Sequence, residues 1–236
     1  MFKFLFIFCL VFSPILASAQ AEDETYNPFA DYSEFEESGE EEADLHFFRN
    51  GRFLTLGFML GQTQGTSNLS KVYSPGMGYG LFLSYFFDLR LAMQFSYFNS
   101  SNDLSVKSLD GTASANAQAK FSTLNLDFKY FLNTQNVTKG LADLNPYILA
   151  GLNQTSKTGS SQNSLEIAKQ NTSGFNLGAG IEFPILRKEM FIGFQVVYNL
   201  VQFPDENTEI SLGSSPTGIK PSGDLLNLQV TLGSNF

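Results

Sequence analysis

The sequence has few of the residues from which catalytic and metal-binding sites are most often built. It contains no tryptophan, a single cysteine, Cys9, and a single histidine, His46. Cys9 lies within the N-terminal apolar segment, so removal of that segment leaves neither a disulfide nor a cysteine-based metal site. Activation of a nucleophile usually needs a neighbouring base, most often histidine. Because the only histidine lies in an acidic stretch, we expect no enzyme activity.

Long apolar runs are also scarce. Apart from Leu5–Leu16, no segment approaches the ~18 continuous apolar residues of a membrane-spanning helix, which excludes a helical membrane protein. Lys3 precedes that run and Ala17-Ser18-Ala19 follows it, which is the order of a charged start, an apolar centre and a cleavage site. We therefore predict a signal peptide over residues 1–20.

Lysine and arginine are absent from residues 21–46, which hold eleven acidic side chains. A block of like charge with few aliphatic residues cannot bury enough apolar surface to fold, so we predict a disordered acidic segment there. Residues 47–236 carry 12 acidic and 13 basic side chains and are nearly neutral. The chain has no basic patch of the kind that nucleic-acid binding requires, so no nucleic-acid partner is expected.

Two features of the acidic segment bear on whether it binds a ligand or a partner. Glu40-Glu41-Glu42 and Asp44 would attract calcium only loosely, because they lack the alternating oxygen ligands and central glycine of an ordered calcium loop. We expect no metal and no cofactor. Aromatic side chains recur in the segment at every third position, at Tyr26, Phe29, Tyr32 and Phe35. They form a motif for a partner, cover one mouth of the following domain, or are scattered along a flexible tail.

From residue 52 onward, apolar side chains recur at every second position, the period of a sheet with two different faces. The last segment is the clearest, with apolar residues on one face at Leu226, Leu228, Val230, Leu232 and Phe236. Eight segments of this kind are expected as strands, at about 52–62, 77–88, 90–100, 121–132, 146–155, 172–184, 190–200 and 223–236. Each is long enough to cross a bilayer when tilted.

The connections between these segments differ in length. The first, third, fifth and seventh are long and polar, at residues 63–76, 101–119, 156–171 and 204–223. The second and sixth are short, whereas the fourth, residues 133–145, breaks the rule. Transmembrane barrels have short periplasmic turns and longer outer loops, with both termini periplasmic when the strand number is even. The lengths therefore favour a barrel with four solvated polar loops at one end.

A soluble sandwich would also give short alternating strands. It is disfavoured because the apolar face is rich in leucine and aromatic residues, typical of a lipid-facing band with an aromatic girdle. The aromatic residues assigned to that face are Tyr85, Phe87, Tyr97, Tyr130, Tyr147 and Tyr198. Ionisable residues on the other face would be costly in a dry sandwich core. We predict an all-β fold, an eight-stranded antiparallel up-and-down transmembrane β-barrel over residues 47–236.

Three features resemble those of the small OmpA-like outer-membrane barrel domains. They are the run Asn145–Leu152, the run Gly174–Glu182 and the terminal Phe236. The resemblance implies location in the bacterial outer membrane, contact with its lipid, and insertion by the barrel assembly machinery through the last strand, with Phe236 as the assembly signal. The acidic segment 21–46 would then be periplasmic and could bind a periplasmic partner.

One group of charged residues is expected inside the barrel. Arg90, Asp127, Lys129 and Glu182 share the inward phase and a similar depth. In an eight-stranded barrel the interior is just wide enough for side chains to fill, so paired charges there would largely close the lumen. The cluster is either a polar core that holds the barrel together or a gated ion path.

These features favour a non-enzymatic barrel with an envelope-structural or surface-interaction role. The alternatives are a narrow pore or conduit for small solutes or apolar molecules and, third, an outer-membrane hydrolase.

Overall fold

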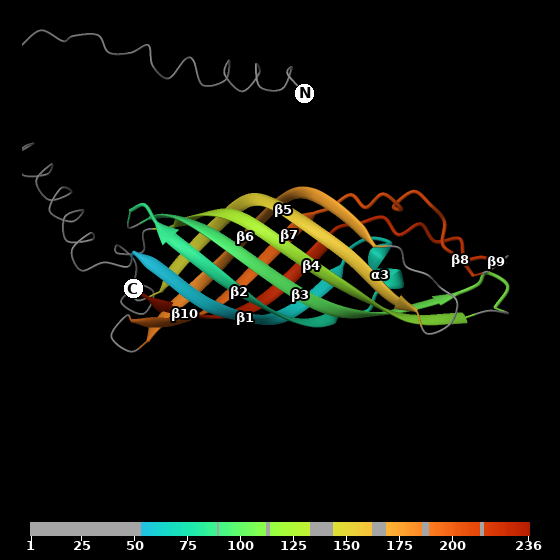
Figure 1. Ribbon diagram of the computed structural model, residues 1–236, viewed down its shortest axis with the longest axis horizontal. Coiled ribbons are helices and arrows are strands. Elements are labelled where there is room, and N and C mark those ends of the chain that lie inside the picture. The colour runs from blue at the N-terminus through green and yellow to red at the C-terminus, as the bar shows by residue number, and fades with distance from the viewer. Residues whose placement is uncertain are drawn as a thin grey trace, which may run out of the picture. The chain divides into compact units, whose positions relative to one another are not determined.

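The computed structural model describes residues 53–88, 90–111, 114–132, 144–161, 169–185, 189–212 and 215–236. Eight of its strands close an antiparallel barrel in which each strand pairs with its neighbours along the chain (Figure 1). These strands are β1 (Leu54–Gly65), β2 (Gly76–Phe86), β3 (Leu91–Lys107), β4 (Ser114–Phe131), β5 (Asn145–Ser161), β6 (Gln170–Ile185), β7 (Met190–Leu200) and β10 (Leu225–Asn235). The predicted eight-stranded up-and-down fold is confirmed. The predicted signal peptide, 1–20, and acidic segment, 21–46, lie outside the described residues.

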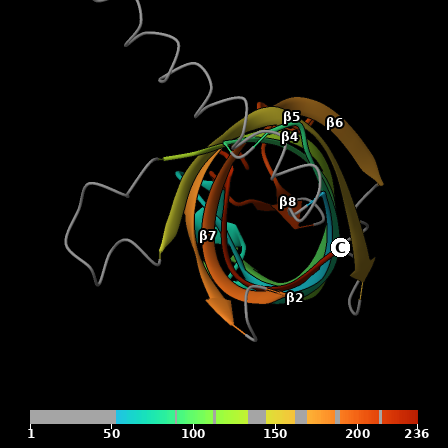
Figure 2. The same cartoon turned by 90° about the vertical axis from the view of Figure 1, so that its left-hand side faces the viewer.

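The barrel closes where the first strand pairs with the last, and the ring is visible end-on in Figure 2. Pairing runs from Thr55 opposite Asn235 to Gly65 opposite Leu225. The carbonyl oxygen of Phe236 accepts hydrogen bonds from the amides of Phe53 and Leu54, both at 3.0 Å. We call this the terminal end of the barrel, and the opposite end the loop end.

The loop end carries three short elements, α3 (Leu69–Val72), β8 (Ser211–Leu212) and β9 (Ser215–Pro216). The amide of Leu109, at the tip between β3 and β4, donates to the carbonyl of Pro216 in β9. In the described part of the chain, no helix combines the length and hydropathy needed to cross a membrane.

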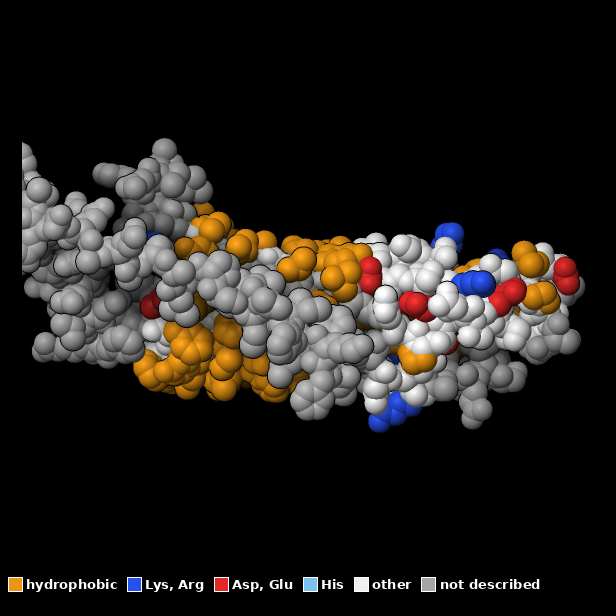
Figure 3. Space-filling view, turned by 90° about the horizontal axis from the view of Figure 1, so that it is seen from above, with side chains coloured by type: hydrophobic (Ala, Val, Ile, Leu, Met, Phe, Trp, Pro, Cys, Tyr) orange, Lys and Arg blue, Asp and Glu red, His pale blue; other side chains and the backbone are white. Residues whose placement is uncertain are grey.

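Exposed and buried side chains alternate along the strands, which confirms the two-faced pattern. Apolar side chains cover the outside of the barrel from the terminal end to about half of its length, where polar ones replace them (Figure 3). The exposed apolar side chains of this band include Leu56, Phe58, Leu60, Leu81, Phe95, Tyr97, Phe128, Ile148, Leu177, Phe194, Val196, Val230 and Leu232. Tyr147, which the sequence placed on this face, is instead buried inside.

Three strands continue well past the apolar band toward the loop end. Residues 101–107 of β3, 114–121 of β4 and 156–161 of β5 form what we call the projection. Residues 101–119 and 156–171 were expected to be loops, and this prediction is wrong for most of the first and for residues 156–161 of the second. The period of two persists there, but apolar Leu104 and Val106 now point inward while Asp103 and Lys107 point outward. Strands were predicted from an apolar outer face. The outer face of these residues is polar because it lies beyond the apolar band.

Large inward aromatic rings lie beside glycines of neighbouring strands. A Cβ at Gly233 of β10 would overlap the ring of Phe191 in β7, and one at Gly57 of β1 would overlap the ring of Phe82 in β2. The interior is narrow, so a bulky ring on one strand requires a residue without a side chain on the next.

Gly233→Ala should lower the free energy of unfolding by about 1–3 kcal/mol, the usual effect of overpacking a filled interior. The measurement is the urea midpoint at which the folded, unheated band disappears from gels of the detergent-refolded protein. In a Phe191→Leu background the same change should have a clearly smaller effect. Equal losses in both backgrounds would show that the ring contact is not the cause.

Candidate functional site in the barrel interior

The interior is filled by three successive layers of side chains. The layer nearest the terminal end contains the ion pair of Lys129 and Glu182, whose Nζ and Oε1 atoms are 3.5 Å apart. Both side chains are buried, and Nζ also lies 4.1 Å from the ring centre of Tyr147. The Tyr147 hydroxyl donates to Gln195 at 2.8 Å, and Gln195 donates to Gln229 at 3.0 Å. This network joins β5, β7 and β10 across the interior.

Aromatic rings fill the rest of this layer. Phe86 stacks on Phe131 with ring centres 5.5 Å apart, and Phe131 lies 5.3 Å from Tyr147. Phe82 and Phe191 approach each other at 6.2 Å and pack with Met59 in a second buried group, which Phe98 extends toward the middle layer, since Phe98 lies opposite Thr123. The charged pair is therefore surrounded by apolar surface.

The structure brings together only part of the charge cluster expected from the sequence. Asp127, Lys129 and Glu182 lie inside the barrel, with Asp127 toward the middle layer. The prediction that Arg90 joins them is wrong, because Arg90 is exposed in the turn before β3. Its amide donates to the Asp88 carboxylate at 2.6 Å. The alternation of β3 would point Arg90 inward if the strand included it, but the strand begins one residue later, at Leu91. Ala92 is therefore the first residue of β3 that points into the interior.

The middle layer is polar and was not anticipated as a unit. Thr63 donates to Asn227 at 2.8 Å, and the hydroxyls of Thr123 and Thr155 are 3.3 Å apart. Buried asparagines stand on five consecutive barrel strands, at Asn125, Asn153, Asn176, Asn199 and Asn227. The recurrence of asparagine at inward positions was the available sequence signal, but only the strand register shows that these residues share one depth.

The layer at the loop end is apolar. Leu69 and Val72 of α3 pack against Leu104, Val106 and inward residues of β4, together with the chain that follows β7. The ring of Tyr73 meets that of Phe121 edge-on at 5.3 Å. Burial, and secondarily the charge of Asp205, raises the pKa of the Tyr73 hydroxyl well above its usual range. Tyr73 therefore stays neutral and acts as a packing residue.

One ion pair ties the chain after β7 to this apolar layer. The buried Lys157 of β5 lies 2.6 Å from a carboxylate oxygen of Asp205, and its Nζ lies 4.7 Å from the ring centre of Phe203. Burial of an ammonium group is tolerated here because it has both a carboxylate and an aromatic face as partners.

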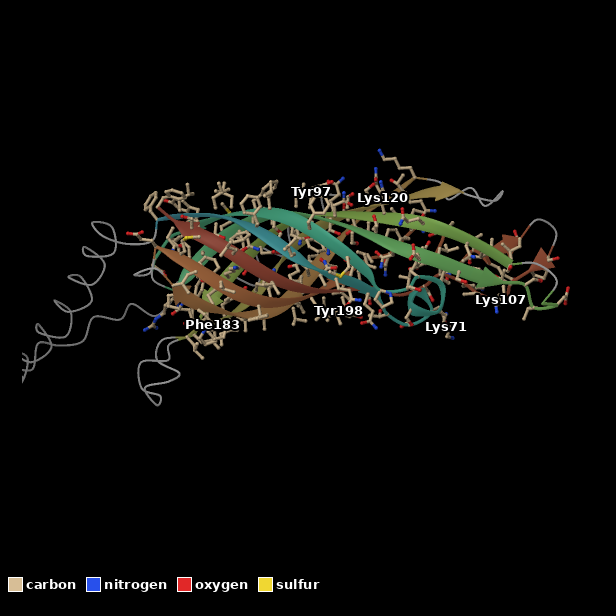
Figure 4. The ribbon with its side chains drawn as sticks, turned by 90° about the horizontal axis from the view of Figure 1, so that it is seen from below. Lys71, Tyr97, Lys107, Lys120, Phe183 and Tyr198 are labelled. Atoms are coloured by element: carbon tan, nitrogen blue, oxygen red, sulfur yellow. The ribbon has the colours of Figure 1, made fainter. Side chains whose placement is uncertain are left out.

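The outside of the barrel shows where the apolar band ends. Figure 4 places Phe183 toward the terminal end, Tyr97 and Tyr198 near the middle, and Lys120, Lys71 and Lys107 successively nearer the loop end. The Tyr198 hydroxyl donates to Asp224 at 2.7 Å. An apolar band bordered by aromatic residues, with lysines beyond it, is the surface expected of a barrel in a bilayer. The described residues contain no group of three His, Cys, Asp or Glu side chains placed to hold a metal ion.

Comparisons with known proteins agree with this geometry. A family model described as "Outer membrane protein beta-barrel domain" matches residues 46–231. The fold is similar to that of Neisserial surface protein A, with a TM-score of 0.52, 14% identity and coverage of 78% of this chain and 97% of that one. It is also similar to the outer membrane protein OprG of Pseudomonas aeruginosa, with a TM-score of 0.53, 12% identity and coverage of 78% and 95%. At these identities the likeness extends to the fold alone. No curated protein sequence matches the chain.

Lys129→Met should lower the free energy of unfolding by about 3 kcal/mol, because it removes the ammonium partner of a buried Glu182 carboxylate. Adding Glu182→Gln should recover part of that loss, which a double-mutant cycle of urea midpoints would measure. Arg90→Met is the matched control and should change stability by less than about 0.5 kcal/mol. Simple additivity of the two interior changes would contradict a coupled pair.

Proposed function

The chain belongs to the family of outer-membrane β-barrel domains, and on that basis we propose that it is a non-enzymatic barrel with a largely closed lumen and a surface-interaction or envelope-structural role. The observation that carries the proposal is the filling of the interior by three layers of buried side chains. We place the protein in the bacterial outer membrane with both termini in the periplasm and the loop end outside.

A solute crossing the barrel would have to displace all three layers in turn. At the terminal end it would meet the Lys129–Glu182 pair among stacked rings. At the loop end it would meet the packing of Tyr73, Phe121 and Phe203 beneath α3. Removing a buried charge pair or an apolar layer is costly because the groups left behind lose their partners. The filled interior therefore supports a structural polar core rather than a gated ion path.

The projection offers the surface through which such a barrel would interact with other molecules. Its outward face is polar and carries both signs of charge, with Asp103 and Lys107 on β3 and Lys120 on β4 exposed. Tyr73 forms an isolated bridge with Leu104, which links the β1–β2 connection to the edge of the projection. The exposed face therefore stands on an ordered core, and it suits a polar partner rather than a purely anionic or cationic one.

Three further partners belong to this proposal. Outer-membrane lipid would contact the apolar band. The assembly machinery would recognise the last strand, in which Phe236 is 68% exposed and closes the ladder with β1. A periplasmic partner would bind residues 21–46, whose acidic and aromatic composition suggests such a role.

The unmodified protein should show no steady conductance of porin size in planar bilayers. Tyr147→Ala and Phe121→Ala each remove a large ring from one layer. Neither variant should conduct, because the other two layers still fill the lumen. Arg90→Ala, outside the interior, is the control. Heat-modifiable gel mobility of the same sample would show that the barrel is folded. Steady conductance by the folded unmodified protein would overturn the proposal and favour a narrow pore.

The proposed orientation can be tested with single cysteines, since Cys9 lies in the predicted signal peptide. On intact cells, a maleimide too large to pass porins should label Lys107→Cys, at the loop end, without permeabilisation. Arg90→Cys, at the terminal end, should be labelled only after the outer membrane is opened. The reverse pattern would place the termini outside.

A further inference from the structure

The outward face of β3, β4, β5 and β6 changes from apolar to polar over a short distance. One row across these strands is wholly apolar, and each of its residues lies opposite the next: Phe95, Leu126, Leu152 and Phe175. Four residues further along each strand toward the loop end, the corresponding row consists of Asn99, Ser122, Ser156 and Asn171. The strand register thus places a wholly polar row close to the lipid-facing surface.

The polar side chains beyond the apolar row form what we call the amide–hydroxyl patch. All of them are exposed or half-buried, and they are Asn99, Ser101, Lys120, Ser122, Gln154, Ser156, Thr158, Asn171 and Ser173. Lys120 is the charged residue among them, and the nearest outward acidic side chain on the described parts of these strands, Asp103, lies one row further toward the loop end. A solvated surface is usually about 25–35% charged. Scarcity of charge beside many hydrogen-bonding groups is typical of a surface that meets a partner.

The patch presents donors and acceptors in a regular array. Amide side chains and hydroxyls each offer both, and a sheet spaces them about 4.8 Å apart between strands and about 6.8 Å apart along one strand. In the described part of the chain, the one hydrogen bond between patch side chains runs from the Ser122 hydroxyl to Asn99 Oδ1, at 3.5 Å. The other groups are available to a partner that itself carries closely spaced donors and acceptors. Hydroxyl groups on neighbouring carbons of a sugar ring have this property.

The position of the patch limits which partner can reach it. The patch lies on the same outward face as the apolar band, and Figure 4 shows Tyr97 and Lys120 near this boundary. Beyond the apolar band of a membrane barrel comes the headgroup layer of the surrounding lipid. The inference rests on the proposed function, which places the loop end outside, where the headgroups of the outer leaflet are the phosphorylated sugars of lipopolysaccharide.

We propose that the amide–hydroxyl patch binds the sugar residues of lipopolysaccharide molecules next to the barrel. Sugar hydroxyls exchange hydrogen bonds with the amide and hydroxyl side chains, and Lys120 pairs with a phosphate, which no acidic side chain of the patch repels. Each contact is weak because it replaces hydrogen bonds to water. Protein and glycolipid share one membrane, so the effective concentration is high enough for weak contacts to act together.

Binding is tested with the full chain refolded in a non-ionic detergent, where orientation in a membrane has no influence. Rough lipopolysaccharide, which carries core sugars, competes with phosphatidylglycerol, which has acyl chains and an anionic phosphate but no sugar. Native mass spectrometry counts the molecules bound. The unmodified protein should prefer the lipopolysaccharide about tenfold, the equivalent of one or two net hydrogen bonds. Sugar released from the same lipopolysaccharide by deacylation should compete at high concentration, whereas dextran, an unrelated glucan, should not.

Three variants connect the preference to the patch. Ser156→Glu places a carboxylate in the middle of the polar row and should abolish the preference. Gln64→Glu adds the same charge at an exposed site on β1, outside the patch, and should leave the preference unchanged. Asp103→Asn removes the nearest carboxylate and should raise the preference, which keeps the proposal testable if Ser156→Glu fails to fold.

Equal binding of lipopolysaccharide and phosphatidylglycerol would overturn the proposal, because acyl chains and charge would then account for all of the binding. A preference that persists in Ser156→Glu would place the sugar contact elsewhere on the barrel. Competition by dextran would show a general sugar-binding surface rather than one for the membrane's own glycolipid. None of these results bears on the closed lumen or on the cysteine labelling of the two ends, so a negative result here leaves the proposed function standing.

Discussion

The narrow interior of a closed eight-stranded sheet is the constraint on which the rest of this structure depends. Because β1 pairs with β10, the ring has no free strand edge. The backbone N–H and C=O groups of the ring are thus hydrogen-bonded between strands, in a region where lipid offers no hydrogen bonds. Closure also brings the inward side chains of opposite strands within reach of each other. Each inward residue must therefore fit the residues beside it, as the Phe191 ring does against Gly233.

The three layers meet this constraint with different chemistry. The terminal layer keeps two charges buried by pairing them and surrounding them with aromatic rings. The loop-end layer resembles the core of a soluble protein, with Leu104 and Val106 packed under a short helix. The middle layer uses amides and hydroxyls. In a low-dielectric interior their hydrogen bonds are strong, and a buried amide or hydroxyl without a partner is costly.

Much of the fold could be predicted from the sequence, because lipid selects apolar residues at every second position. The prediction failed where the outer face no longer meets lipid, as in residues 101–107. It also failed around Tyr147, where both faces of the strand are apolar. At Arg90 it failed because the inward–outward alternation of β3 was continued beyond the end of the strand. The asparagine layer could not be predicted, because the pairs Asn125–Asn153 and Asn176–Asn199 depend on register between segments distant in the sequence.

The projection is made of the same strands that form the barrel wall. A binding surface built on loops loses conformational entropy when a partner orders it. The projection differs from such loops, because β3–β4 pairing continues through it from Leu91 to Lys107. A partner would meet a preformed shape, so its affinity would depend on complementarity rather than on induced ordering. Substitutions on the outward face would then alter recognition without altering the scaffold, which leaves that face free to diversify.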